Sequence, residues 1–376
     1  MVRARVAIQL VSTGGVYGAE KALLELADYL RDRGWQSFVV ALEGHGASDL
    51  VRRALAQGLA AHSFVPAGRM AIVPMLLRLR RLLAAHPRAV VHSHGYKPDV
   101  LLALLNAPHR LACVSTCHSW YSETTKLRIL EAADKRVLRR FDHVVAVSEE
   151  IRSELLASGV AEERVTLINN GISAPPVEPA AREQVRAELG LPSNSRLIVQ
   201  LGRLAPSKRN DLLITAMTRL RDPTGVHLLF AGEGGELGRL TDQAAGSGLG
   251  RQVHFIGYRS DVPRLLCAAD AMVVSSDKEG LPITILEAMA LRCPIVSTAV
   301  GAIPDALEKG TDAWVVPPND AVLLAAAINE ALNNPTLARA RSESAYQRFR
   351  LGYSRDAMGR AYHDIYDNVW RARGWG

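Results

Sequence analysis

The chain has 376 residues, 48% of them hydrophobic and 22% charged, which supplies enough apolar mass for two cores of ordinary domain size. No uncharged stretch reaches the roughly 18 apolar residues that a transmembrane helix needs, and the apolar run after Arg5 is too short for a signal peptide, so we expect a cytoplasmic protein. The net charge of +7 lies mostly in residues 1–170, but the basic residues there form no nucleic-acid-binding motif, so no nucleic-acid partner is expected.

The first half of the chain predicts strands that alternate with amphipathic helices. A strand at Arg5–Val11 precedes a helix at about 19–33, whose apolar residues recur at i, i+3, i+4 and i+7. The further strands expected here are Ser37–Ala41, Ala89–His92, Leu111–Ser115, His143–Val147 and Arg164–Ile168. Because these strands show no alternation of polar and apolar residues, they indicate a parallel sheet covered by helices on both faces.

Residues 173–181 carry three prolines and indicate a stiff linker, after which the alternation restarts. The strands expected in the second half are Leu197–Leu201, Val226–Ala231, Val253–Ile256, Ala271–Val274, Ile295–Ser297 and Trp314–Val316. The fold class is therefore α/β, with two doubly wound Rossmann-like domains that face a deep cleft. We place the N-terminal domain at 1–174 and the C-terminal domain at 175–354, and expect the last helix, about 355–376, to pack back onto the first domain.

Two loops at predicted strand ends of the second half carry charged residues. One runs from Glu279 to Glu287, with Pro282 as the expected first residue of a helix. A helix N-terminus with a glycine beside it suits phosphate or sugar oxygens, and carboxylates accept hydrogen bonds from hydroxyls. Taken alone, Glu279 could equally cap the helix and Glu287 could be a solvated helical residue. The other loop places Arg203 and Lys208 after a strand. Two fixed cations at one edge of a sheet suit a diphosphate. Either residue taken alone would more often be an ordinary surface charge.

The remaining histidines and cysteines have simpler interpretations. His92 and His94 either line an acceptor site or pack in the core, and Ser148 either caps a helix or contacts an acceptor. Cys113, Cys117 and His118 lack a fourth ligand and match no common zinc spacing, so no metal is expected. The four cysteines include no C-x-x-C pair, and we expect reduced thiols.

Taken in order, these motifs resemble those of the retaining family 4 glycosyltransferases, which have the two-domain GT-B fold. The resemblance covers nearly the whole chain. In the second half it rests on Gly202-Arg-Leu with Lys208, Gly232-Glu-Gly234, Ile256-Gly-Tyr258, Ser275 to Gly280, Glu287, Gly301 and Val315 to Asp320. In the first half it rests on Gly14-Gly15, Val91 to Gly95, Thr116 to His118, Val147-Ser148 and Asn170-Gly171.

The resemblance implies a role for several residues. Arg203 and Lys208 would bind the donor diphosphate, Glu279 the sugar hydroxyls and Glu287 the ribose. His118 would approach the donor sugar near the reaction centre, so the catalytic residues implied are His118, Glu279, Arg203 and Lys208. The donor site would be completed by Gly15, in a loop closing over the diphosphate, and by Gly280, Leu281, Pro282 and Ile283.

The implied reaction moves a hexosyl or N-acetylhexosaminyl group, with retention, from a nucleoside-diphosphate sugar to a saccharide or lipid-linked acceptor in cell-surface polysaccharide or glycoconjugate synthesis. A UDP-sugar is expected as the donor in preference to a GDP-sugar. No cofactor and no metal is implied, because fixed cations and a helix N-terminus would neutralise the departing diphosphate. The chain departs from the family pattern at Arg209 and Ala313, where glycine is common, and at Asp305, where Glu is common.

Two other classes of function stay open at this point. One is a nucleotide-sugar-binding pseudoenzyme or assembly partner of a glycan-synthesis complex, and the other is a dinucleotide oxidoreductase, although the first glycine turn lacks the G-x-G-x-x-G fingerprint. Residues 69–83 are apolar and basic, with Arg78, Arg80 and Arg81 close together. They form either an ordinary core face with a solvated basic edge or a peripheral contact with the anionic inner face of a membrane.

Overall fold

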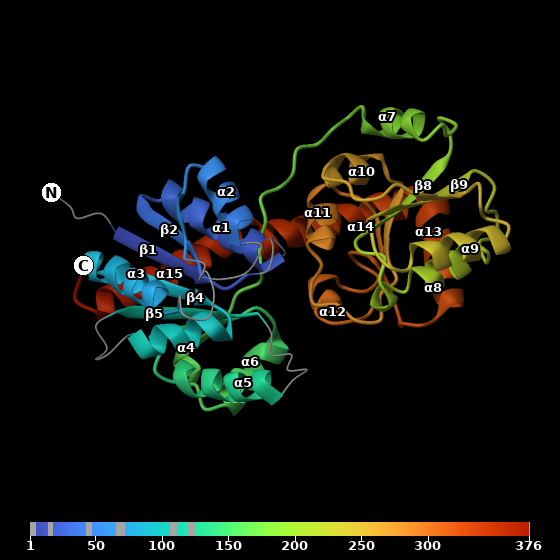
Figure 1. The fold of residues 1–376 in the computed structure, drawn as a ribbon. Coiled ribbons are helices and arrows are strands. Elements are labelled where there is room, and N and C mark those ends of the chain that lie inside the picture. The colour runs from blue at the N-terminus through green and yellow to red at the C-terminus, as the bar shows by residue number, and fades with distance from the viewer. Residues whose placement is uncertain are drawn as a thin grey trace. The chain divides into compact units, whose positions relative to one another are not determined.

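The computed structural model describes residues 5–13, 18–42, 47–64, 72–105, 111–118 and 125–375. The chain divides into two compact units: unit 1 comprises Met1–Ser173 with Gly352–Gly376, and unit 2 comprises Ala174–Leu351. Each unit contains one parallel sheet flanked by helices (Figure 1), which confirms the prediction of two doubly wound α/β domains. Across these described ranges, no helix combines the length and the hydropathy that a membrane span requires.

The sheet of unit 1 has the strand order β3-β2-β1-β4-β5-β6-β7, and every neighbouring pair is parallel. Its strands are β1 (Arg5–Val11), β2 (Trp35–Ala41), β3 (Ala60–Ser63), β4 (Ala89–His94), β5 (Ala112–Cys117), β6 (His143–Ala146) and β7 (Val165–Leu167). Its helices are α1 (Gly18–Asp32), α2 (Ala47–Ala56), α3 (Ile72–Ala85), α4 (Tyr96–Leu105), α5 (Thr125–Leu138), α6 (Glu149–Ala157) and α15 (Arg355–Ala372).

The strand β3 is missing from the sequence prediction. Its four residues read Ala-Ala-His-Ser and lie at the edge of the sheet, largely exposed, so they carry no apolar run that would mark a strand. The strand β4 is longer than predicted and includes both His92 and His94, which places these side chains within the sheet.

The two faces of the unit 1 sheet bury different residues because side chains alternate along each strand. Val6, Ile8 and Leu10 of β1 pack in a core with residues of α3, α4, α5 and α6. Ala7 faces the opposite side and packs in a core with residues of α1 and α15. The carboxyl halves of β1, β4 and β5 therefore direct every second side chain toward the face that α1 and α15 cover.

The helix α15 follows unit 2 in sequence but is part of unit 1 (Figure 1). It packs along α1, and its Tyr362, Tyr366 and Trp370 are buried. The close approach depends on Gly359, where an added Cβ would lie 2.3 Å from the ring of Tyr29. Ion pairs at the two ends of the helix, including Arg355 with Asp28 at 2.8 Å, supplement this packing.

The sheet of unit 2 has the order β10-β9-β8-β11-β12-β13 and is also entirely parallel. Its strands are β8 (Arg196–Leu201), β9 (Val226–Ala231), β10 (Val253–Phe255), β11 (Ala271–Val274), β12 (Ile295–Thr298) and β13 (Trp314–Val316), which agree with the predicted strands to within one residue at each end. Its helices are α7 (Ala181–Glu188), α8 (Asn210–Met217), α9 (Leu237–Gly246), α10 (Val262–Ala268), α11 (Ile283–Ala290), α12 (Ile303–Ala306), α13 (Ala321–Asn333) and α14 (Pro335–Arg348).

Candidate functional site

The loops that leave the carboxyl ends of the unit 2 strands carry most of the sequence motifs. These loops follow β8, β9, β11, β12 and β13, whose neighbours in the sheet are all parallel. Parallel strands end at the same edge of a sheet, so the loops meet there, as ligand-binding loops of doubly wound folds do.

Two of these loops pack backbone against backbone. Gly202 N donates a hydrogen bond to Ala231 O at 3.1 Å, and Leu204 N donates to Glu233 O at 2.9 Å. An added Cβ at Gly232 would lie 1.9 Å from Gly202 O, a distance no side chain tolerates. The Gly-Glu-Gly turn therefore contains glycine because the loop after β8 occupies the space that a side chain would need.

Lys208 and Glu279, which the sequence places 71 residues apart, are in direct contact. Lys208 lies in a short 3-10 turn, Pro206–Lys208, before α8, and its Nζ donates to Glu279 Oε1. Ser276 Oγ donates to the same carboxylate oxygen at 2.6 Å. The side chains of Lys208 and Glu279 are 19% and 11% exposed, so the charges are held at the surface of the edge with limited freedom.

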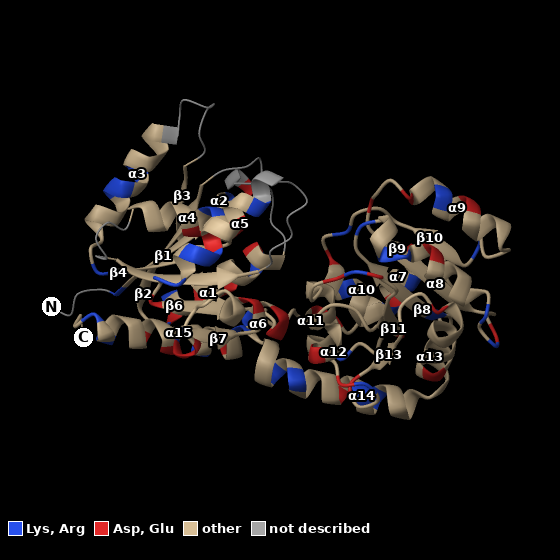
Figure 2. Ribbon diagram, turned by 90° about the horizontal axis from the view of Figure 1, so that it is seen from below, with Lys and Arg blue, Asp and Glu red and all other residues tan. Residues whose placement is uncertain are grey.

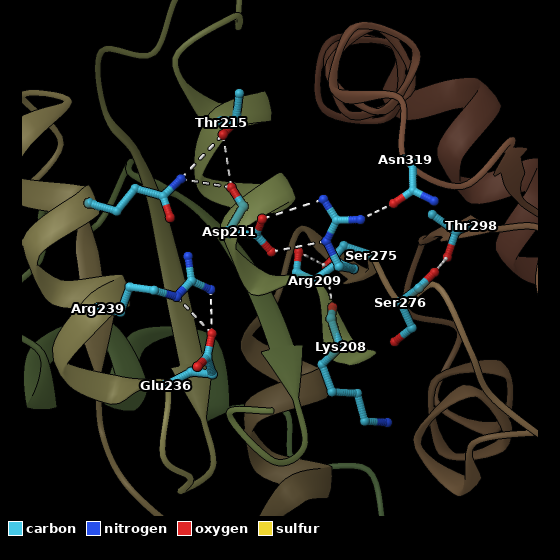
Figure 3. Close-up of polar contacts among 11 residues, drawn as sticks. Lys208, Arg209, Asp211, Thr215, Glu236, Arg239, Ser275, Ser276, Thr298 and Asn319 are labelled. Atoms are coloured by element: carbon cyan, nitrogen blue, oxygen red, sulfur yellow. Dashed lines mark hydrogen bonds and ion pairs between the residues drawn. The ribbon is translucent and has the colours of Figure 1, made fainter. Parts of the chain in front are cut away.

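Hydroxyl groups hold the loops that carry this ion pair (Figure 3). Ser275 Oγ lies 2.9 Å from the carbonyl oxygen of Lys208 and 3.0 Å from that of Arg209, and donates to this pair of acceptors. Thr298 Oγ1, at the end of β12, donates to the carbonyl oxygen of Ser276 at 2.6 Å. The loops after β8, β11 and β12 are thereby fixed to one another, although the sequence alone assigned no role to these hydroxyls.

Arg209 occupies a position where left-handed backbone geometry is required. Its φ is +47°, a conformation that is costly for residues other than glycine, which accounts for the glycine that family 4 sequences often have here. Its guanidinium donates to Asp211 and to Asn319 of the loop after β13 (Figure 3). The contact with Asn319 connects the loop after β8 to the loop after β13.

Gly301 supports the loop that contains Glu279. Its φ is +54°, and an added Cβ would lie 2.0 Å from Glu279 O and 2.8 Å from Gly280 O. The next residue, Ala302, donates its N–H to Gly280 O at 3.2 Å. The loop after β12 thus lies against the peptide groups that precede α11.

The helix α11 begins one residue later than the sequence predicted. Pro282 has a ψ of 131° and is the N-cap residue, and α11 starts at Ile283, because the extended conformation of Pro282 excludes it from the helix. Pro282 has no side-chain acceptor, so the first N–H groups of α11 donate no hydrogen bond to a cap side chain. The alternative that Glu279 caps this helix is wrong, because the N-cap residue is Pro282 and the Glu279 carboxylate accepts from Lys208 and Ser276 instead.

The other donor-site residues that the resemblance named in unit 2 lie on the same loops or in α11. Gly280 and Arg203 are exposed, and Leu281, Ile283 and Glu287 are half-buried. His118 belongs to unit 1, where it follows β5, and Gly15 lies outside the described residues. The structure therefore joins Lys208 directly to Glu279 and assigns His118 to a separate unit.

His92, His94 and His118 form a cluster in unit 1. His92 and His94 are buried, which confirms the core interpretation for both, and their hydrogen-bond partners are side chains. Burial lowers the pKa of His92 to about 3 and that of His118 to about 4. All three imidazoles are consequently neutral near pH 7.

Ser148, Cys113 and Cys117 lie in unit 1. Ser148 is the N-cap of α6 and accepts a hydrogen bond from Ile151 N at 3.3 Å, which confirms the structural interpretation. Cys113 and Cys117 are buried free thiols, and burial raises the pKa of each well above its ordinary value. In the part of the chain that the structure describes, no three His, Cys, Asp or Glu side chains are grouped as metal ligands.

Both halves of the sequence match known family models. Residues 16–174 match the model described as Glycosyltransferase Family 4, and residues 181–348 match Glycosyl transferases group 1. A glycogen synthase of Mycobacterium tuberculosis is 30% identical over 338 residues, which cover 85% of this chain and 76% of that protein. A D-inositol 3-phosphate glycosyltransferase of Mycolicibacterium smegmatis is 27% identical over 296 residues, which cover 73% of this chain and 66% of that protein.

Solved structures match over nearly the full length. HepE of Anabaena, crystallised with UDP, has a TM-score of 0.84 at 21% identity and covers 97% of this chain and 100% of its own. A glycosyltransferase of Rickettsia africae has a TM-score of 0.84 at 20% identity, and the match covers 98% of this chain and 99% of that one. These matches confirm the GT-B fold that the resemblance implied.

Because Gly301 contacts the Glu279 loop, we expect Gly301→Ala to destabilise unit 2 more than an alanine substitution at another glycine with positive φ. Gly310→Ala is the matched control, because Gly310 has a φ of +84° and no atom within 4 Å of an added Cβ. We expect the control to cost about 1 kcal/mol and Gly301→Ala roughly 1–3 kcal/mol more, measured by urea unfolding. Equal losses in the two variants would contradict a close contact at Gly301.

The lowered pKa values predict that unit 1 loses stability as the pH falls. Below about pH 6.5 the unfolded chain binds a proton at His92 and at His94, whereas the folded unit keeps both neutral, so each contributes a loss of about 1.4 kcal/mol per pH unit. Hydrogen exchange of the β4 and β5 amides should report falling stability from pH 6.5 to 5 and constant stability from pH 7 to 8. Unchanged stability between pH 6.5 and 5 would show that these imidazoles are protonated in the folded state.

Proposed function

The chain belongs to glycosyltransferase family 4, and on that premise we propose that it transfers a hexosyl or N-acetylhexosaminyl group, with retention, from a UDP-sugar to a saccharide or lipid-linked acceptor. The observation that carries this proposal is the contact of Lys208 with Glu279 beside the N-terminus of α11. One edge of unit 2 thereby offers a cation, a carboxylate and backbone N–H groups to a ligand that contains both phosphate and hydroxyl groups.

The proposed chemistry uses these groups for positioning and charge neutralisation. Arg203 and Lys208 bind the diphosphate and offset the charge that develops on it as the glycosidic bond breaks, aided by the N–H groups of Gly280 to Ile283. Glu279 accepts hydrogen bonds from sugar hydroxyls, and Glu287 accepts them from the ribose. No protein nucleophile is required, and the residues supply their charges without a metal ion.

The solved relatives support a UDP-sugar and a saccharide as the two substrates. HepE of Anabaena has been crystallised with UDP and with UDP-glucose. A mutant of TarM from S. aureus has been crystallised with fondaparinux, alpha-GlcNAc-glycerol and UDP. By analogy, we propose a role for this chain in cell-surface polysaccharide or glycoconjugate synthesis.

A thermal-shift screen against UDP, GDP, ADP, their sugar conjugates and NAD tests the donor class, since a ligand that binds only the folded state raises the melting temperature. We expect stabilisation by UDP and at least one UDP-sugar. Stabilisation by NAD alone would contradict the proposal and favour an oxidoreductase. Donor binding with no transfer and no donor hydrolysis would favour the pseudoenzyme.

Variants of the ion pair separate phosphate binding from catalysis. Lys208→Ala should weaken UDP binding by about 10- to 100-fold, as expected for loss of a charge-assisted hydrogen bond. Glu279→Ala should retain UDP binding, because it leaves Lys208 available to phosphate, but should lose most transfer. Isothermal titration with UDP and hydrolysis of the UDP-sugar provide the two measurements.

Arg219→Ala is the matched control for these variants. Arg219 is exposed beyond the C-terminal end of α8, whereas Lys208 lies before its N-terminal end. Arg219→Ala should leave both UDP binding and turnover unchanged. If Lys208→Ala and Arg219→Ala had the same effect, the assignment of Lys208 to the diphosphate would be wrong.

The outer surface of α3 supports a further part of the proposal, a peripheral contact with the inner face of the cell membrane. Leu79 and Leu83 of this helix are buried in the unit 1 core, so part of the segment 69–83 has the ordinary structural role. Val73 and Leu77, one helical turn apart, are 62% and 49% exposed. Arg78, Arg80 and Arg81 are also exposed, and Figure 2 shows basic residues on this helix. Exposed apolar and basic groups on one short helix are typical of binding to anionic lipid.

Flotation with liposomes that contain anionic lipid tests this contact. We expect the protein to float with these liposomes and the double variant Val73→Asp and Leu77→Asp to remain in the dense fraction. Leu55→Asp is the control, since Leu55 is 56% exposed on α2, which lies on the other face of the sheet. Absence of the wild-type protein from the floating fraction would remove the proposal of membrane contact.

A further inference from the structure

Buried polar side chains connect His118 to α15 within unit 1. Gln9 interrupts the apolar run of β1 and is fully buried, and His94 of β4 lies between it and His118. Tyr366 of α15 contacts Gln9 from the other side. We call this set, which continues through His92, Thr116 and Tyr362, the imidazole network. Its members other than His118 are each at least nine-tenths buried.

The half of the network near His118 has a defined hydrogen-bond direction. Gln9 Nε2 donates to Tyr366 OH at 3.0 Å, so Gln9 Oε1 faces His94 Nε2 at 2.9 Å. An amide oxygen only accepts, and therefore His94 carries its hydrogen on Nε2. His94 Nδ1 is then a lone pair, and His118 Nε2, 3.5 Å away, carries the hydrogen that points to it. The nitrogen left without a hydrogen is Nδ1 of His118.

The other half of the network continues the hydrogen-bond direction that starts at Gln9. Tyr366 OH lies 2.6 Å from His92 Nδ1, and His92 Nε2 lies 2.7 Å from Thr116 Oγ1. Because Tyr366 accepts from Gln9, its own hydrogen is donated to His92 Nδ1. Reversing the Gln9 amide would place its oxygen and its NH2 group against the opposite partners and would require every hydrogen in the network to change sides.

Burial keeps the network neutral. It lowers the pKa of His118 to about 4 and the pKa of His94 well below its ordinary value. A doubly protonated His94 would present an N–H to the N–H of His118, with no acceptor between them. The described direction of hydrogen bonds therefore depends on neutral imidazoles.

We infer that Gln9 and Tyr366 are positioning residues, which hold His118 as the tautomer with hydrogen on Nε2 and a lone pair on Nδ1. In this form Nδ1 of His118 can accept a hydrogen bond from a hydroxyl group of a ligand. The identity of that hydroxyl-bearing ligand rests on the proposed function, whereas the tautomer is a property of unit 1 alone.

Long-range 1H–15N correlation spectra of histidine-labelled protein at pH 7, without substrate, test the tautomer. The His118 signal, assigned by its loss in His118→Asn, should show hydrogen on Nε2 and an unprotonated Nδ1. Hydrogen on Nδ1, or a protonated ring, would overturn the inference. Because this readout needs no donor or acceptor, its failure is distinct from failure of UDP binding or transfer.

Tyr366→Phe tests the positioning role. It removes the hydroxyl that accepts the hydrogen bond from Gln9 Nε2 but keeps the ring, whose centroid lies 5.5 Å from that of Trp35. We expect His118 to populate both tautomers and kcat to fall roughly threefold to tenfold, as for loss of one hydrogen bond, with the KM for the UDP-sugar unchanged. Gln9→Met should give the same pattern, so the test survives if one variant fails to fold.

Tyr29→Phe is the matched control, because Tyr29 is a buried tyrosine that contacts α15 outside the imidazole network. It should leave the His118 tautomer and kcat unchanged. A single Nε2 tautomer and unaltered kcat in Tyr366→Phe would show that the network is only structural.

Discussion

The candidate site depends on peptide backbones that approach one another at the carboxyl edge of the unit 2 sheet. At Gly232 and at Gly301 the neighbouring carbonyl oxygen occupies the position that a Cβ would need. A peptide group is planar and rigid, so such close backbone packing leaves little room for either loop to shift. Lys208 and Glu279 extend from loops held in this way, and the hydroxyls of Ser275 and Thr298 add further restraint. The positions of Lys208 and Glu279 therefore depend on the close backbone packing at Gly232 and Gly301.

The ion pair between Lys208 and Glu279 matters more for positioning these two side chains than for the stability of unit 2. An ion pair of partly exposed groups contributes little to stability, typically about 0–1 kcal/mol. Its effect is to hold Lys208 and Glu279 at the edge in defined conformations before a ligand arrives. Under the proposed function, a diphosphate would replace the carboxylate as the anion beside Lys208, and a sugar hydroxyl would replace the ammonium as the donor to Glu279. Each charge would then exchange one partner for another without being left unpaired, which avoids the cost of an isolated partly buried charge.

The sequence predicted most of the fold because parallel strands buried on both faces appear as uninterrupted apolar runs. The prediction failed at β3, whose residues Ala60–Ser63 lie at an exposed edge where no such run is needed. Motif order also indicated residues at the unit 2 edge, since Arg203, Lys208 and Glu279 carry charge in loops that follow predicted strands. It could not reveal that Lys208 binds Glu279, because contacts between loops depend on the three-dimensional positions of strands that are distant in sequence.

The imidazole network shows a different limit of sequence reasoning. A glutamine within the apolar strand β1 was a visible signal, since a polar side chain buried in a sheet requires partners. The partners come from β4, β5 and α15, and α15 is separated from β1 by the whole of unit 2. A segment that ended before unit 2 would leave Gln9 and His92 without Tyr366, and the desolvation cost of such unpaired groups is about 1–3 kcal/mol each. The return of α15 therefore makes the hydrogen bonding of unit 1 dependent on residues that follow unit 2, and links the environment of His118 to the last helix of the chain.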